Sequence, residues 1–177
     1  MKTLYFVRHG QSQANIEKVF AGSGYDAPLT PTGLEQAKNI SATLRGKLID
    51  IIVSSPLKRA KETADCIAKE IGYQGEILLQ PLLKERDYGV ATGQSWGKDI
   101  EVRIDDDNID GLEKLEQLAA RMQQLLDWLK TLKDEHILVV GHGTSESMLY
   151  TIYQGKPYKT YLQTEELQNA MIREYRI

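Results

Sequence analysis

The stretch Leu4-Tyr5-Phe6-Val7-Arg8-His9-Gly10 decides how the rest of the chain is interpreted. Four apolar residues in a row, ended by a glycine, are typical of a short buried strand. Arg8 and His9 follow that strand at once, and such polar side chains are too costly to leave without partners at the end of a buried element. We therefore expect other polar groups, or a ligand, to meet them there.

The same kind of apolar run recurs at 50–53, 77–79 and 137–140, and helical patterns lie between the runs. Thr30 and Pro31 are suited to the cap and the first position of a helix. Regular alternation of strands and helices predicts an α/β fold, a three-layer α/β/α sandwich with a mostly parallel central sheet. We expect further helices at about 57–71, 112–132 and 143–153, and two strand-like segments within 159–176, joined by a turn near 165–166.

Length and composition favour one compact unit. The chain has 177 residues, of which 41% are hydrophobic and 27% charged, and its net charge is -3. We expect a single domain over 1–177, with a small irregular cap around 84–111 whose run Asp105-Asp106-Asp107 is solvated. A weakly acidic chain is not typical of nucleic-acid binding proteins. No stretch predicts a signal peptide or a membrane span, so a cytoplasmic protein is expected.

Three of the predicted strands lead into unusual polar residues. The first runs into Arg8 and His9, the second leads through Ser54-Ser55-Pro56 to Arg59, and the fourth runs into Gly141-His142-Gly143. Ligands in such folds bind beyond the carboxyl ends of the strands. These residues are therefore expected to meet in one site.

Two arginines and two histidines around one point favour a phosphate group. Guanidinium groups match phosphate oxygens, and a glycine such as Gly143 at the start of a helix lets backbone N–H groups approach an anion. A neutral histidine is also a competent nucleophile. Any of these residues taken singly is more often structural, and a zinc site of His9, His142 and Glu85 is conceivable. Two nearby arginines would oppose a divalent cation, so we expect no metal.

Five segments, in order and with matching spacing, resemble the histidine phosphatase superfamily, which is also called the phosphoglycerate mutase-like family. One such segment would be weak evidence, whereas five in order are specific. They span residues 4–143, most of the chain, and comprise 4–15 with the Arg-His-Gly signature, 29–37, 54–64 with Arg59, 83–89 with Glu85, and 139–143 with His142.

The resemblance implies a role for each candidate residue. His9 would attack the phosphoryl group and become a phosphohistidine, while Arg8, Arg59 and His142 hold the phosphate oxygens. Asn15 would add a hydrogen bond to the same group. Glu85 would protonate the leaving alcohol and then activate water. Hydrolysis of this kind needs neither a metal ion nor an organic cofactor.

The cap region departs from the family's pattern. Gly89-Val90-Ala91-Thr92-Gly93 lacks the aromatic residue that often follows, since Trp96 comes later, and 111–115 only partly matches a Gly-Glu-Ser segment. The substrate is therefore left open. We expect a phosphatase for a small phosphomonoester, because the short stretch between Gly89 and Leu112 cannot build a broad lid. A phosphoglycerate mutase, a phosphoprotein or phosphohistidine phosphatase, and a non-catalytic binding protein are the alternatives.

Overall fold

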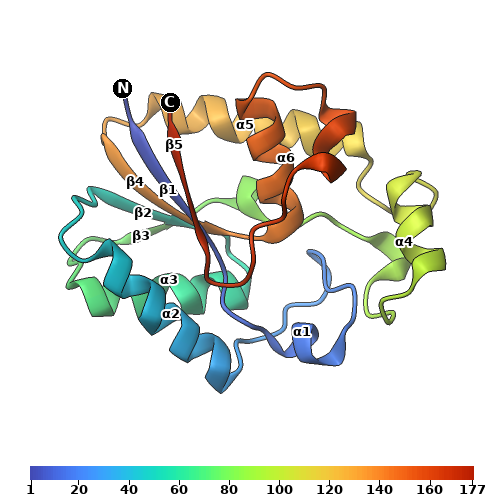
Figure 1. Ribbon diagram of the computed structural model, residues 1–177, viewed down its shortest axis with the longest axis horizontal. Coiled ribbons are helices and arrows are strands. Elements are labelled where there is room, and N and C mark those ends of the chain that lie inside the picture. The colour runs from blue at the N-terminus through green and yellow to red at the C-terminus, as the bar shows by residue number, and fades with distance from the viewer.

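The computed structural model describes residues 1–177 and confirms the three-layer α/β/α sandwich (Figure 1). The sheet has five strands in the order β3-β2-β4-β1-β5. Its strands are β1 (Thr3–Arg8), β2 (Ile51–Ser54), β3 (Ile77–Leu79), β4 (His136–Gly141) and β5 (Ile172–Arg176). The first four are mutually parallel, and β5 runs antiparallel to β1 at the edge, so the sheet is mostly parallel as predicted.

Helices cover both faces of the sheet (Figure 1). The six α-helices are α1 (Gln13–Glu17), α2 (Pro31–Leu44), α3 (Lys58–Ile71), α4 (Lys98–Asp105), α5 (Leu115–Thr131) and α6 (Gly143–Tyr153). Leu4 and Phe6 of β1 pack in the core beneath α5 and α6, whereas Tyr5 and Val7 pack against α2 and α3. Burial on both faces explains why the strand reads as a continuous apolar run. No helix has the length and apolar character needed to cross a lipid bilayer.

The start of α2 fixes the loop that follows β1. The Thr30 side chain accepts a hydrogen bond from the Gly33 N–H at 3.0 Å, and Pro31 occupies the first helical position, as predicted. A Cβ atom on Gly10 would lie 2.3 Å from the carbonyl oxygen of Gly33. Only a glycine lets the chain after His9 pass this close to the helix.

The segment 84–111 is more ordered than the sequence predicts. It contains a 3-10 turn at Gly89–Ala91 and the helix α4, which lies away from the sheet (Figure 1). Ile104, Ile109, Leu112 and Ala91 form a small apolar cluster of their own. The expectation of an irregular segment was wrong because only Ile100 and Ile104 repeat at helical spacing in an otherwise charged sequence.

The acidic run at 105–107 is not simply solvated. Asp105 ends α4, and Asp107 pairs with the fully buried Arg86 at 2.6 Å. Both Asp107 carboxylate oxygens also accept the Leu115 N–H at 3.1 Å. This contact caps α5, which therefore starts at Leu115 and not at Leu112 as predicted.

The C-terminal segment holds one strand and not two. Tyr158–Gln163 forms a 3-10 helix, and only Ile172–Arg176 pairs with the sheet. Tyr161 is buried against α6 and α5, which explains why this segment resembled a strand in sequence. Residues 165–171 return across the end of β1, where the Ala170 N–H donates to the Arg8 carbonyl at 3.0 Å.

Candidate active site

The carboxyl ends of β2, β4 and β1 meet because these strands are neighbours in the sheet. The His9 N–H donates to the Gly141 carbonyl at 3.0 Å, and the Ser55 N–H donates to the Val140 carbonyl at 2.9 Å. A cavity of about 520 Å³ opens at this edge. Its walls include five of the predicted site residues, Arg8, His9, Asn15, Arg59 and Glu85.

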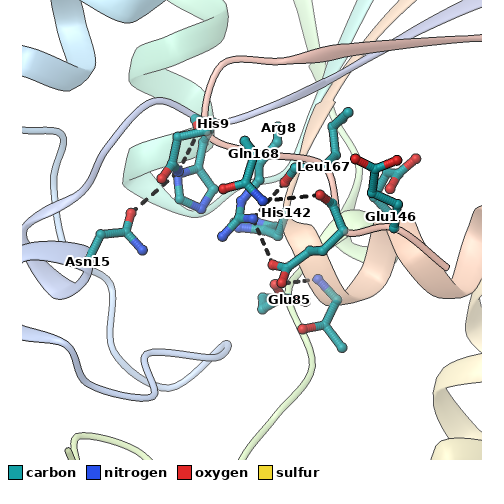
Figure 2. A network of polar contacts seen from close by, with 12 residues as sticks. Arg8, His9, Asn15, Glu85, His142, Glu146, Leu167 and Gln168 are labelled. Atoms are coloured by element: carbon teal, nitrogen blue, oxygen red, sulfur yellow. Dashed lines mark hydrogen bonds and ion pairs between the residues drawn. The ribbon is translucent and has the colours of Figure 1, made fainter. Parts of the chain in front are cut away.

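Figure 2 shows Arg8, His9, Asn15 and Glu85 around one space, with His142 beside His9. The two imidazole rings meet edge to face, with their centroids 5.1 Å apart. His9 and His142 are both buried, at 4% and 0% exposure. The structure therefore brings the sequence-predicted residues together, from segments far apart in the chain.

His9 is held in one neutral tautomer. Its Nδ1 lies 2.7 Å from the Gly10 carbonyl oxygen, which can only accept, so Nδ1 carries the proton. The Arg59 Nε–H donates to Nε2 at 3.3 Å, which requires a lone pair there. Burial, with the positive charges of Arg59 and Arg8, lowers the pKa of His9 well below its usual value. Nε2 is thus an unprotonated, nucleophilic nitrogen.

Arg59 reaches the site from the first turn of α3 and is itself buried. Its Nη2 donates to the Gly22 carbonyl at 2.7 Å, and its Nη1 donates to the Tyr25 carbonyl at 3.2 Å. Gly22 has φ +52°, a conformation that favours glycine. The loop after α1 therefore orients the guanidinium so that its Nε–H faces His9.

Arg8 lies against the start of α6. Its Nη1 donates to Glu166 Oε1 at 2.7 Å and to the Leu167 carbonyl at 2.6 Å. A Cβ atom on Gly143 would come within 2.9 Å of the guanidinium, so a larger residue there would have to displace the Arg8 side chain. The Arg8 Nε–H is buried and has no hydrogen-bond partner.

His142 presents a second unsatisfied donor. Its Nε2 lies 2.8 Å from Ser55 Oγ, which already accepts the Leu57 N–H at 3.3 Å. The serine hydroxyl can therefore donate to Nε2, which places the imidazole proton on Nδ1. Burial is the main cause that lowers the pKa of His142, followed by the charge of Arg59. The His142 Nδ1 atom is buried and has no partner in the protein.

These two orphan donors are an argument for an anionic ligand. Buried polar groups are nearly always hydrogen-bonded, and an unpaired one costs about 1–3 kcal/mol. Arg8 and His142 lie together on one side of His9, whose Nε2 lone pair is engaged only by the Arg59 Nε–H at 3.3 Å. A group with several acceptor oxygens, such as phosphate, would satisfy both donors at once.

Glu85 is fixed by the backbone at the start of α6. Its Oε1 accepts the Ser145 and Arg86 N–H groups, each at 2.9 Å, and its Oε2 accepts the Thr144 N–H at 3.1 Å. The helix N-terminus also favours a negative charge at this point. Oε2 makes only one such bond, so it keeps a lone pair for proton transfer at the cavity wall.

Asn15 faces the cavity from α1. Its Oδ1 accepts the Ser12 N–H at 2.9 Å and the Ser12 hydroxyl at 3.0 Å. These bonds orient the amide so that its nitrogen faces the space beside His9 (Figure 2). The side chain can therefore donate a hydrogen bond to a ligand.

The C-terminal segment adds residues that the sequence did not indicate. Glu166, Gln168 and Asn169 line the cavity, and the Asn169 amide donates to the His9 carbonyl at 3.0 Å. Nothing in the local sequence marks them, because they reach the site only through the antiparallel pairing of β5 with β1. Ser55, in contrast, lay within the segment that introduced Arg59 and could have been found there.

The zinc alternative has no support in this geometry. No group of three or more His, Cys, Asp or Glu side chains in the protein is arranged to hold a metal ion. Both oxygens of Glu85 already accept backbone N–H groups, and the nearest partner of His9 Nε2 is a guanidinium.

Comparison with known proteins gives one consistent answer. Residues 4–177 match the sequence model of the histidine phosphatase superfamily, branch 1. The uncharacterized phosphatase PhoE of Bacillus subtilis is 34% identical over 97% of this chain and 86% of its own length. The 2,3-bisphosphoglycerate-dependent phosphoglycerate mutase of Methylorubrum extorquens is 33% identical over 93% of this chain and 84% of its own length.

A solved structure supports the same grouping. A mutant of the phosphoserine phosphatase from Entamoeba histolytica, in complex with phosphoserine, superposes with a TM-score of 0.82 at 26% identity. The match covers 98% of this chain and 90% of that one. With a family match over nearly the whole chain, and with relatives that include phosphatases and a mutase, the chain belongs to the histidine phosphatase superfamily.

Proposed function

We propose that this protein is a phosphatase that hydrolyses a small phosphomonoester, without a metal ion, through a covalent phosphohistidine at His9. One observation carries the proposal. The Nε2 lone pair of a neutral, buried His9 lies beside two buried donors, Arg8 Nε and His142 Nδ1, that have no partner in the protein. A nucleophile next to vacant donors is the arrangement that phosphoryl transfer needs.

In the first step, the Nε2 lone pair attacks phosphorus and a P–N bond forms. The bond between phosphorus and the ester oxygen breaks, and protonated Glu85 gives its proton to that oxygen, so an alcohol leaves. Arg8, Arg59, His142 and Asn15 donate hydrogen bonds to the phosphoryl oxygens as their charge rises. The Gly10 carbonyl stabilises the charge that His9 gains, through the Nδ1–H bond.

In the second step, water attacks phosphorus and the P–N bond breaks. The Glu85 carboxylate accepts a proton from that water, and inorganic phosphate leaves. Glu85 is then protonated again for the next substrate, and His9 is again neutral. The Oε2 lone pair at the cavity wall supports this alternation of roles.

A mutase is the second candidate, because a phosphoglycerate mutase is among the relatives. A mutase must return the phosphoryl group to its substrate before water reaches it. Here the cap over the cavity consists of a 3-10 turn and the eight-residue helix α4, and Trp96 at the cavity wall is half exposed. So small a cover favours hydrolysis over retention of the phosphoenzyme.

The test is steady-state release of inorganic phosphate from a panel of phosphomonoesters in the presence of EDTA. The panel includes p-nitrophenyl phosphate, sugar phosphates, nucleotides, phosphoserine and 3-phosphoglycerate, with the last also assayed for conversion to 2-phosphoglycerate. We expect phosphate release that EDTA does not reduce and that His9→Ala abolishes. Isomerisation without phosphate release would replace the phosphatase with the mutase.

A further inference from the structure

A second cavity of about 280 Å³ adjoins the active site. The two cavities share five lining residues, Phe20, Tyr88, Glu101, Thr144 and Glu166. Since Glu85 and Thr144 are joined by a hydrogen bond of 3.1 Å, the shared wall begins where the leaving oxygen would be protonated. We call this second space the leaving-group cavity, because the alcohol part of a substrate would extend into it.

The charges that face the leaving-group cavity are mainly negative. Glu101 and Asp105 line it from α4 and make no ion pair, while Glu166 forms an ion pair with Arg8. Arg86 is the one cation in its wall. Arg86 is fully buried and already donates to Asp107 at 2.6 Å and to backbone carbonyls, so it has little capacity left for a ligand.

Aromatic rings complete the walls. Phe20 and Tyr88 meet edge to face with their centroids 5.5 Å apart, and Tyr161 also lines this cavity. Trp96 lies in the wall of the adjoining active-site cavity. Ring faces combined with carboxylates attract an organic cation and repel an anion.

An unpaired hydroxyl points to a polar ligand group here. Ser147 lines the leaving-group cavity from α6 and is only 4% exposed, yet its Oγ has no hydrogen-bond partner. Thr144, one helical turn earlier, contributes to the walls of both cavities. A ligand N–H in the leaving-group cavity would give Ser147 the partner that the protein does not supply.

We propose that the leaving-group cavity binds a protonated amine on the alcohol part of the substrate, and that it excludes a second anionic group. The inference rests on the proposed phosphatase and narrows its substrate class to phosphomonoesters of amino alcohols. The phosphate would lie at His9, the amine near Glu101, Asp105 and Ser147, and the carbon chain along the aromatic rings. A carboxylate or second phosphate placed there would meet like charges and no free cation.

The test compares linear alkyl monophosphates that differ only at the far end. Chains of three and five carbons carry an ammonium, a hydroxyl or a carboxylate group, so length and leaving group are matched within each set. We expect kcat/KM to fall in that order, with the ammonium ester preferred over the carboxylate ester by about tenfold or more. An equal or reversed order at both lengths would overturn the proposal.

Two double variants locate the effect. Glu101→Gln/Asp105→Asn should bring the ammonium-to-carboxylate ratio close to one. Asp99→Asn/Asp106→Asn removes two exposed charges from the same helix and its cap, outside the leaving-group cavity, and should leave the ratio unchanged. If both doubles change the ratio equally, the selectivity comes from overall charge and the site assignment fails.

The outcomes separate this inference from the proposed function. Turnover of p-nitrophenyl phosphate that depends on His9, without a preference for ammonium esters, would refute the cavity assignment and leave the phosphatase intact. Ser147→Ala offers an independent check, since it should reduce kcat/KM for the preferred ammonium ester and spare the hydroxyl ester. If the wild-type protein turned over none of these phosphomonoesters, the proposed function itself would be refuted.

Discussion

Proton positions at a few residues determine what this site can do, and Glu85 is the clearest case. Its carboxylate accepts two backbone N–H groups at the start of α6 and the N–H of the next residue, Arg86. These bonds suit a base that accepts a proton from water, and in the proposed mechanism the same oxygen delivers that proton to the leaving group in the next cycle.

Glu85→Gln removes the proposed proton donor, so its effect should depend on the leaving group. We expect kcat/KM for alkyl phosphates to fall by about 10²–10⁴-fold, and for p-nitrophenyl phosphate far less, because a nitrophenolate leaves without protonation. Rates on a series of esters with graded leaving-group pKa check this, with Glu116→Gln on the outside of α5 as the control. Equal losses across the series would argue against Glu85 as the acid.

The lowered pKa of His9 predicts how the activity should depend on pH. Burial and the neighbouring arginines lower the pKa of His9 well below its usual value. In the proposed mechanism only neutral His9 attacks phosphorus. The neutral fraction therefore falls only as the pH drops through this lowered pKa, well below 6.5. A pH profile of kcat/KM, corrected for ionisation of the free substrate, should show no loss from histidine protonation near pH 6.5. An acidic limb centred there would contradict the assignment.

Most of the polar residues at the site could be predicted from sequence, and the reason is local. Arg8, His9, Arg59 and His142 each follow a recognisable apolar strand, so their position relative to the sheet is set within a few residues. Glu166 and Asn169 have no such marker, since their place depends on how the chain returns to pair with β1. The orphan donors are also invisible in sequence, because they depend on which hydrogen bonds remain unmade.

Among the elements, β5 and α6 are joined by a buried ion pair that supports the active-site segment 165–169. Arg173 Nη1 donates to both oxygens of Glu146, at 2.8 and 2.9 Å, and Tyr175 donates to one of them at 2.6 Å. The Glu146 side chain is 0% exposed. Arg173 Nη2 also donates to the Glu165 carbonyl at 2.8 Å, next to the glutamate that holds Arg8.

Arg173→Met leaves the buried Glu146 charge without its partner, which should cost about 3–5 kcal/mol of unfolding free energy. Urea denaturation measures this. Arg176→Met on the same strand is the control, because it breaks a largely exposed pair with Glu174 and one hydrogen bond to Thr3, and should change the stability by no more than about 2 kcal/mol. Similar losses in both variants would show that the buried pair is not the cause.

The loss of stability in Arg173→Met should also depend on pH. Burial raises the pKa of Glu146 in the folded protein, so the folded state holds that proton more tightly than the unfolded state does. Lowering the pH through the raised pKa therefore adds stability. Without Arg173 to oppose it, this rise in pKa should be larger, and the destabilisation of Arg173→Met should shrink as the pH is lowered. A deficit that is constant with pH would contradict this account.

Helices and strands were predicted correctly where the hydrophobic periodicity of the sequence was strong, and the predictions failed where it was weak. The strand at 137–140 and the cap at Thr30 were confirmed within a residue or two. Helix α4 was missed because its short, charged sequence buries little more than Ile104. The prediction of a second strand in the C-terminal segment was wrong, because the apolar residues near Tyr161 belong to a 3-10 helix.

For the whole molecule, two apolar cores on opposite faces of one sheet hold the layers together, and a third, smaller cluster holds the cap. Runs of fully apolar strand residues made the layered fold predictable. The edge position and antiparallel direction of β5 were not predictable, because they follow from chain return over a long distance and not from any local pattern.

The expectation of a single domain over 1–177 can be tested with the two tryptophans. Trp96 lies in the cap and Trp128 lies on α5 against the large core. Arg86 joins the cap to the rest through its contacts with Asp107, Tyr161 and the Glu113 carbonyl. Trp128→Phe leaves Trp96 to report on the cap by fluorescence, and Trp96→Phe leaves Trp128 to report on the large core. In urea, each fluorescence midpoint should coincide with the circular dichroism midpoint of the same variant. A cap signal that is lost first would show a separate unit.

The central claim is that His9 carries the phosphoryl group, and trapping the labelled enzyme tests it most directly. Protein mixed with a radiolabelled phosphomonoester would be quenched in alkaline detergent within milliseconds, and the labelled peptide would be identified by mass spectrometry and phosphorus NMR. The account predicts an alkali-stable, acid-labile phosphate on Nε2 of His9, formed before phosphate release and absent in His9→Ala. Phosphate release without any labelled protein, or a label on another residue or on Nδ1, would contradict it.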